Sequence, residues 1–310
     1  NARVDAFSLN KASIALDRAW TRGQNFRFAL RQAVKKTLQQ VTHDLNQHNS
    51  PAYLCGVPIT RHTASQLSHE LATSAPDFVN HLHFVNAYSL SCANRDAELA
   101  NVFRGGRCYA DGFPIVWSII RLGIAKGWRR GHRVRGPEVF ARTLDASQLT
   151  GATHYLLGGT TRTLERLTSE IARQFPGAKV VGSASPPFAA HYEVDWDPYL
   201  RDIQATGAAL VWVGLGTPKQ DFVAQHLAHR DSERTYLAVG AAFDFVAGTV
   251  PTAPRWMQER GLEWFFRLAS EPRRLWRRYL IGNSHFILLV VRQALATRVL
   301  QQRTRTRAPR

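Results

Sequence analysis

Cysteine is scarce in this sequence, which has only Cys55, Cys92 and Cys108 among its 310 residues and no CxxC pair. This scarcity excludes a disulfide scaffold and a cysteine zinc cluster, and it suits a protein of the reducing cytosol. The twelve histidines show no HExxH or comparable ligand spacing, which argues against a catalytic metal. We therefore expect no metal site and no cofactor.

Long apolar runs are also lacking. The longest candidate for a membrane span, Tyr279–Thr297, is interrupted by small and polar residues at 282–285 and by Arg292, which disfavours spanning. The composition, with 45% hydrophobic and 20% charged residues, is that of a globular protein and excludes wholesale disorder. A chain of this length can bury the core of one large α/β domain or of two small domains.

Acidic residues are few relative to basic ones, because 23 Asp and Glu stand against 40 Lys and Arg and give a net charge of +17. The excess is concentrated at one end, where residues 272–310 contain ten arginines and no acid. Such an end is typical of proteins that bind nucleic acid, anionic lipid or a phosphorylated substrate. Composition alone does not choose among these three partners.

Short apolar runs rich in β-branched or aromatic residues predict buried strands at 52–57, 81–85, 153–157, 208–214 and 235–239. Helical patterns lie between them, such as Arg162–Gln174, which ends at Pro176-Gly177. This alternation indicates an α/β fold, a largely parallel sheet with helices on both faces. We expect a polar helical extension at 1–50, an α/β domain at 51–252 and a basic helical C-terminal appendage at 253–310.

Three predicted strands run directly into turns of glycine and small polar residues. These turns read Gly158-Gly159-Thr160-Thr161, Leu215-Gly216-Thr217-Pro218-Lys219-Gln220 and Gly240-Ala241-Ala242-Phe243-Asp244. Glycine lets a backbone approach a ligand closely, and free N–H groups at a helix start favour phosphate. Any one of them is interpretable as an ordinary turn, but three in succession favour a nucleotide diphosphate site at the strand ends. No Walker or dinucleotide fingerprint is present, which disfavours ATPases and NAD-binding enzymes.

Two aspartate positions are candidates for chemistry. Asp111, in Tyr109-Ala110-Asp111-Gly112, is either a structural Asp-Gly turn or a general base at the end of a strand. The sequence Asp195-Trp196-Asp197 resembles the DxD pair with which some sugar-nucleotide enzymes hold a divalent cation. Asp197 directly precedes Pro198, a pattern typical of a helix N-cap, and we favour the cap.

A family resemblance covers the chain from about Ala52 to Arg278. The segments that carry it are FVNAYSLSCANRD (84–96), YADG (109–112), RVRGPEVF (133–140), YLLGG (155–159), FPGAKVVG (175–182), VGLGTPKQD (213–221), VGAAFDFVAG (239–248) and APRWMQERGLEWFFRLASEPRRLWRRY (253–279). In order and spacing they resemble the WecG/TagA/CpsF family of bacterial glycosyltransferases. The resemblance implies a Rossmann-like fold and an inverting hexosyltransferase, which moves a sugar from a UDP-sugar to a polyprenyl-diphosphate-linked saccharide. The products would feed exopolysaccharide, teichoic acid linkage or common antigen synthesis.

The resemblance also implies roles for individual residues. Asp111 would be the general base that deprotonates the acceptor hydroxyl, and Asn86 would lie beside it in the acceptor cleft. Lys219 and Gln220 would contact the nucleotide sugar, and the backbone would close on it at Gly158, Gly159 and Gly216. The diphosphate would be neutralised by C-terminal arginines, here among Arg267, Arg273, Arg274, Arg277 and Arg278. The chain departs from the family pattern at Phe84, at Pro186-Pro187-Phe188 and at Asp221.

The C-terminal arginines also bear on location. Placed on a helix at about 100° per residue, the arginines of 273–280 occupy one face, and Leu275, Trp276, Tyr279 and Leu280 occupy the other. This pattern fits a helix on an anionic membrane, or a surface helix packed on its own domain. We expect a cytoplasmic protein, peripheral on the inner face of the membrane.

The alternative function is that of a nucleic-acid-binding protein that uses the arginine-rich end, although we find no known nucleic-acid-binding module. An inactive sheet scaffold is the third possibility.

Overall fold

The computed structural model describes residues 51–73, 79–251 and 253–306. The helical extension expected at 1–50 lies outside the described residues. All of the described residues belong to one compact unit, Pro51–Arg310. Within these ranges the side chains of Arg255, Glu259, Arg274 and residues 299–306 are not described.

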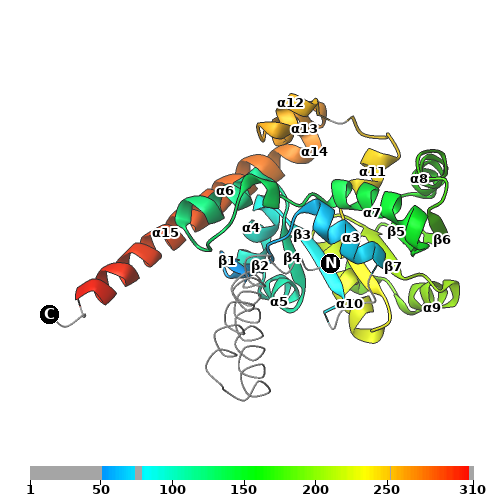
Figure 1. Ribbon diagram of the computed structural model, residues 1–310, viewed down its shortest axis with the longest axis horizontal. Coiled ribbons are helices and arrows are strands. Elements are labelled where there is room, and N and C mark those ends of the chain that lie inside the picture. The colour runs from blue at the N-terminus through cyan, green and yellow to red at the C-terminus, as the bar shows by residue number, and fades with distance from the viewer. Residues whose placement is uncertain (1–50, 74–78, 252, 307–310) are drawn as a thin grey trace, which may run out of the picture. The chain divides into compact units, whose positions relative to one another are not determined.

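Six parallel strands form the central sheet, in the order β4-β3-β8-β7-β5-β6 (Figure 1). The strands are β3 (His81–Val85), β4 (Arg107–Ala110), β5 (Thr153–Gly158), β6 (Lys179–Ala184), β7 (Leu210–Gly214) and β8 (Thr235–Ala238). Every neighbouring pair in this order is parallel. The expected α/β fold is therefore confirmed, and all six carboxyl ends lie at one edge of the sheet.

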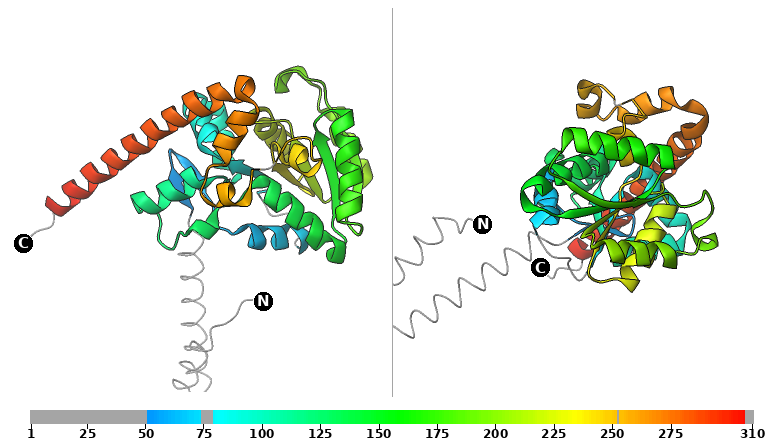
Figure 2. Two further views of the ribbon diagram at one scale, coloured as in Figure 1. Left: turned by 90° about the horizontal axis from the view of Figure 1, so that it is seen from above. Right: turned by 90° about the vertical axis from the view of Figure 1, so that its right-hand side faces the viewer.

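Helices cover both faces of this sheet, as expected (Figures 1 and 2). The first face packs against α3 (Ala64–Thr73), α7 (Gly136–Thr150), α8 (Thr161–Gln174) and α11 (Ala242–Val246). The opposite face packs against α4 (Ala87–Arg95), α5 (Ala97–Gly105), α6 (Phe113–Leu122), α9 (Asp197–Thr206) and α10 (Lys219–Arg230). Successive strand residues point to opposite faces, so Phe84 joins the first core and Val85 the second.

The sequence predicted four of these six strands and missed two. The strands at 81–85, 153–157, 208–214 and 235–239 are confirmed, with ends that differ by at most two residues. β6 was missed because it is an edge strand with no buried residue and no apolar run. β4 was missed because it is only four residues long.

The single strand predicted at 52–57 is wrong. This segment starts a small antiparallel hairpin of β1 (Ala52–Leu54) and β2 (Val57–Ile59). Cys55 and Gly56 form its turn with φ of +51° and +80°, the backbone that a two-residue hairpin turn requires.

The C-terminal appendage is helical, as expected. It contains α12 (Arg255–Glu259), α13 (Glu263–Ser270) and α14 (Pro272–Trp276), followed by a π-helical turn, η3 (Arg277–Ile281), and α15 (Gly282–Thr306). The first half of α15 packs on the domain, where Phe286 is buried and His285 Nδ1 lies 2.8 Å from Ser91 Oγ of α4. Its later turns project away from the sheet (Figure 2).

The apolar face expected over 273–280 is only partly covered by the domain. Leu275 is buried, whereas Trp276 and Leu280 are 42% and 55% exposed. The Arg278 guanidinium lies over the Tyr88 ring of α4, 4.9 Å from its centroid. Two causes act together: the π-helical turn changes the angular spacing of the side chains, and packing on α4 decides which of them face inward.

Among the described residues, Arg277–Arg298 is long and apolar enough to cross a membrane, and little of its most apolar stretch is buried. That criterion is one of length and composition alone, and core helices of soluble proteins also meet it. The polar interruption at 282–285 falls where this helix contacts α4, because Gly282 packs on Tyr88 and His285 meets Ser91.

Candidate active site

The carboxyl edge of the sheet brings together most of the predicted site residues. Val85 and Ala110 are register partners, so Asn86 and Asp111 leave adjacent strands side by side. Gly158 and Gly214 are register partners in the same way. The loops after β3, β4, β5 and β7 therefore meet at this edge, which is where parallel α/β sheets bind their ligands.

Asp111 is anchored by backbone hydrogen bonds on both sides. Its N–H donates to the Val85 carbonyl at 2.8 Å, and the carbonyl of the preceding Ala110 accepts from Val134 N at 2.8 Å. Gly112, with φ of +98°, then turns the chain into α6. These hydrogen bonds fix the backbone of Asp111 directly after the carboxyl end of β4, at the edge of the sheet.

The electrostatic surroundings of Asp111 are mixed. Burial raises its pKa to about 6 and is the largest effect. The positive charge of Arg135 lowers this pKa, and the negative charge of Glu263 raises it. Arg133 and Arg278 lower it further. A carboxylate with this pKa is mostly ionised at neutral pH and remains basic enough to accept a proton, which is what a general base needs.

Asn86 has a defined structural role beside Asp111. Its Oδ1 accepts hydrogen bonds from the N–H groups of Tyr88 at 3.0 Å and Ser89 at 3.2 Å, which caps α4. The cap fixes the direction of the Asn86 side-chain amide at the start of α4. Phe84, which departs from the family pattern, is buried in the core near Tyr109 and brings no polar group to the site.

Glycine at the ends of β5 and β7 lets the two strands close on each other. A Cβ at Gly158, where φ is +129°, would lie 2.6 Å from the Gly214 carbonyl oxygen. Gly159 and Gly216 have φ of +72° and +77°, a conformation that favours glycine. These glycines therefore shape the loops at the edge, and Gly158 permits the close approach of β5 to β7.

Lys219 and Gln220 turn inward at the start of α10. Lys219 Nζ donates to the carbonyl oxygens of Ala189 at 2.6 Å and Pro187 at 3.2 Å. Gln220 is 3% exposed; its Oε1 accepts from Gly216 N at 3.0 Å, and its Nε2 donates to Ala238 O at 3.2 Å. Both side chains thus hold neighbouring loops in place; their predicted contact with the nucleotide sugar stays a prediction.

The C-terminal arginines do not act as one group. Arg278 lies partly buried on Tyr88 and is among the charges that influence Asp111. Arg273 and Arg277 are exposed, and Arg277 lies over the Trp276 ring. The side chain of Arg274 lies outside the described residues. Among the described side chains of this predicted group, Arg278 lies in the surroundings of Asp111.

Two further arginines, Arg133 and Arg135, were missed as site residues. They flank Val134, whose N–H donates to the Ala110 carbonyl, and both contact the appendage. Arg135 donates to Gln258 Oε1 at 2.8 Å and forms an ion pair with Glu263, while Arg133 donates to the Gln258 carbonyl at 3.0 Å. The signal in the sequence was RVRGPEVF, in which arginines alternate with Val134 so that both point to the same side of an extended segment.

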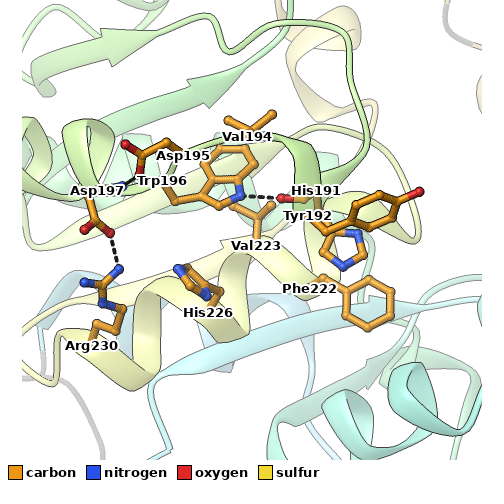
Figure 3. Close-up of a pocket in the computed structure, with 10 residues that line it drawn as sticks. All are labelled: His191, Tyr192, Val194, Asp195, Trp196, Asp197, Phe222, Val223, His226 and Arg230. Atoms are coloured by element: carbon orange, nitrogen blue, oxygen red, sulfur yellow. Dashed lines mark hydrogen bonds and ion pairs between the residues drawn. The ribbon is translucent and has the colours of Figure 1, made fainter.

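A pocket of about 340 Å³ lies on the flank of α10 (Figure 3). It is lined by His191, Tyr192, Val194, Asp195, Trp196, Asp197, Phe222, Val223, His226 and Arg230. The His191 ring stacks on Phe222, with centroids 4.3 Å apart. None of the predicted site residues lines this pocket.

The same region corrects the expected cap at Asp197. Trp196 occupies the N-cap position of α9, and Asp197 is the first residue of the helix. Asp195 Oδ1 accepts from Asp197 N at 3.0 Å, and Asp197 forms an ion pair with Arg230. The described residues contain no group of three or more His, Cys, Asp or Glu side chains placed to hold a metal ion.

Comparison with known families gives a match over most of the chain. The family model described as "Glycosyl transferase WecG/TagA/CpsF family" matches residues 52–300. The matched range contains every predicted site residue, from Asn86 to Arg278, and every strand of the sheet.

Proposed function

The chain belongs to the WecG/TagA/CpsF family of glycosyltransferases, and from this premise we propose that it moves a hexose from a UDP-sugar to a polyprenyl-diphosphate-linked saccharide. Family membership makes it a glycosyltransferase of cell-surface polysaccharide synthesis, which uses a sugar donor and a lipid-linked acceptor. The UDP donor, the polyprenyl diphosphate and the inversion of the anomeric carbon are our proposal.

The observation that carries the proposal is the placement of Asp111. It is a half-buried carboxylate at the carboxyl edge of the sheet, with a pKa raised by burial to about 6. In the proposed step this carboxylate accepts the proton of the acceptor hydroxyl as the hydroxyl oxygen bonds to the anomeric carbon. The bond from that carbon to the UDP oxygen breaks, and its electron pair leaves with the diphosphate. Attack from the face opposite the leaving group inverts the anomeric centre.

Cationic side chains near Asp111 support the departure of a diphosphate. Arg133 and Arg278 both influence the Asp111 carboxylate. Arg267 of α13 lies over the Phe245 ring, and its buried Nε has no hydrogen-bond partner in the described part of the chain. Guanidinium groups bind phosphate oxygens strongly. We assign the developing charge of the diphosphate to these arginines.

For its location we propose the inner face of the cell membrane. The outward face of α15 carries exposed apolar side chains at Ile287, Leu288, Val291 and Leu295, and exposed Arg273 and Arg277 precede it. Apolar insertion beside cationic contacts is the usual design of an interfacial helix. Such a helix would hold the enzyme where a polyprenyl acceptor resides.

A transfer assay tests the proposed function. The protein is incubated with a panel of UDP-sugars and a short-chain polyprenyl-diphosphate-linked saccharide, and UDP release and lipid product mass are measured. We expect UDP release that requires both substrates, with one donor preferred. No transfer from any UDP-sugar would overturn the proposal. Tight binding of a nucleic acid duplex at physiological salt would instead favour the alternative function.

A further inference from the structure

A chain of buried polar side chains lies inside the domain, away from the edge where the site opens. His81 and His83 on β3 and Asp221 on α10 are 3%, 0% and 2% exposed. His81 Nδ1 lies 2.9 Å from His83 Nε2, and His83 Nδ1 lies 2.9 Å from Asp221 Oδ1. We refer to these three residues as the buried His–Asp chain.

The chemistry of the carboxylate fixes one proton in this chain. An ionised Asp221 only accepts hydrogen bonds, so His83 Nδ1 must carry the hydrogen that it donates to Asp221 Oδ1. Burial lowers the pKa of His81 to about 3, and the neighbouring His83 and His229 also lower it, by smaller amounts. His81 is therefore neutral at physiological pH. The directional pair in this chain is thus His83 Nδ1 with Asp221 Oδ1.

Stability does not explain the presence of this pair. Asp221 Oδ2 is buried and has no hydrogen-bond partner within the described residues. A buried, incompletely paired carboxylate costs free energy, and apolar side chains of similar volume often pack there at no loss. What a directional pair adds is a defined position of one element relative to another.

The two elements that the pair joins belong to different halves of the candidate site. Asp221 follows Lys219 and Gln220, which hold the loops on the donor side. His83 lies two residues before Val85, whose carbonyl accepts from Asp111 N. In the sheet β8 lies between β7 and β3, so the pair connects the loop after β7 to a strand that β7 does not touch.

Packing leaves the pair little freedom. A Cβ at Gly106 would lie 2.7 Å from both His81 Nδ1 and His83 Cδ2. The rings of Phe103 and His83 pack edge to face, with their centroids 5.3 Å apart. The His83 imidazole is therefore held in one orientation by its neighbours, with Nδ1 toward Asp221.

We propose that His83 and Asp221 are positioning residues, which set the donor-side loop at residues 215–220 at the distance from Asp111 that transfer requires. The proposal rests on the proposed function, because it assigns that loop to the UDP-sugar. Misplacement by about 1 Å of a group far from the chemistry can lower a rate about 10²-fold.

The test compares Asp221→Ala with Asp221→Asn, which keeps an oxygen acceptor for His83 Nδ1–H. We expect Asp221→Ala to weaken UDP binding about tenfold and to lower kcat about 10²-fold, and Asp221→Asn to restore most of both. His83→Ala should match Asp221→Ala, and the double variant should be no worse than either single one, because each removes the same contact. Calorimetric titration with UDP and the transfer assay supply the two readouts.

Asp231→Ala is the matched control. Asp231 is also buried and bound, by Arg234 Nη1 at 2.8 Å and by the Tyr236 hydroxyl at 3.0 Å, but it lies beyond the opposite end of the sheet. It should lower the thermal midpoint without changing UDP affinity. Equal losses of UDP affinity in Asp231→Ala and Asp221→Ala would reduce the effect to general destabilisation and overturn the proposal.

A spectrum checks the hydrogen bond itself, and UDP binding separates this proposal from the proposed function. In ¹⁵N-histidine spectra of the full chain, His83 Nδ1 should be protonated in the parent and should lose its distinct signal in Asp221→Ala. A parent that binds no UDP refutes the proposed function and, with it, the assignment of the loop. A parent that binds UDP, with an Asp221→Ala variant that binds it equally well, refutes the positioning role alone.

Discussion

The role of Asp111 is best tested by Asp111→Asn, which keeps the shape of the side chain and removes its basicity. Loss of a general base lowers the rate about 10²–10⁴-fold. The structure adds a second expectation, because burial raises the Asp111 pKa from 3.8 to about 6 in the folded protein. The same variant should therefore change catalysis and stability in opposite directions.

The sign of the stability change follows from the direction of this pKa shift. Above pH 6 the folded protein carries a desolvated carboxylate, which the unfolded chain ionises without cost. A shift from 3.8 to about 6 corresponds to about 3 kcal/mol of destabilisation of the charged form at pH 7. Since Asp111 keeps some exposure and Asn must also be desolvated, we expect Asp111→Asn to raise the free energy of unfolding by about 1–3 kcal/mol at pH 7.

The pH dependence of the parent enzyme gives the third readout. With a pKa of about 6, Asp111 is about 90% ionised at pH 7 and about 10% ionised at pH 5. The value of kcat/KM should fall about tenfold per pH unit below 6, with a bend near pH 6. The assay is UDP release at constant ionic strength from pH 5 to 8, beside urea unfolding of each variant.

Asp145→Asn is the matched control, because Asp145 is an exposed acid on α7. It should leave both kcat/KM and stability unchanged. Full activity in Asp111→Asn would refute the assignment of the base and return Asp111 to the role of a turn residue. An Asp111→Asn variant that fails to fold would refute the electrostatic reasoning, since that reasoning requires a more stable protein.

Three further predictions concern the framework of the site and its location. Burial lowers the pKa of His81 to about 3 and of His154 to about 4. Between pH 7 and pH 5 both histidines therefore become protonated in the unfolded chain and stay neutral in the folded protein. The free energy of unfolding should fall by about 2 kcal/mol for each of these two histidines. The raised pKa of Asp111 offsets about 1 kcal/mol of this loss, because the folded protein gains a proton there. Urea titrations at pH 7 and pH 5 measure the difference. Gly158→Ala should cost about 3 kcal/mol, measured as a lower urea midpoint, because the added Cβ meets the Gly214 carbonyl at 2.6 Å. Reversing the charge of exposed Arg273 and Arg277 to Glu should reduce co-sedimentation with anionic vesicles, since each basic residue contributes about 1 kcal/mol at such a surface.

Each of these has a contrary outcome. Gly131→Ala is the control for Gly158→Ala, because an added Cβ at Gly131 meets nothing within 4 Å; equal losses in the two variants would contradict the steric argument. Stability that is unchanged between pH 7 and pH 5 would contradict the neutral buried histidines. Undiminished co-sedimentation of the Arg273/Arg277 variant at moderate salt would place the membrane contact elsewhere.

The sequence alone predicted the sheet and the edge at which the site forms. Runs such as LVWV at 210–213 are apolar throughout because a strand of a parallel sheet is buried on both faces, and this pattern is local. The glycine turns after these strands are equally local, and strands that run parallel must end at one edge. These two facts were enough to place Gly158 and Gly216 at one edge of the sheet before any coordinates were considered. The position of Asp111 beside Asn86 came instead from the family resemblance, because β4 was not predicted as a strand.

What the tertiary structure decided depends on residues far apart in the chain. Glu263 lies 128 residues from its partner Arg135, and Asp221 lies 138 residues from His83, so no periodicity or spacing could pair them. The inward direction of Gln220 and the distribution of the C-terminal arginines were likewise set by packing, which turned Arg278 toward α4 and left Arg277 at the surface. Local patterns determine which backbone a segment adopts. The charges around Asp111, such as those of Glu263 and Arg278, are instead set by long-range contacts. These contacts form only when the C-terminal appendage packs on the edge of the sheet.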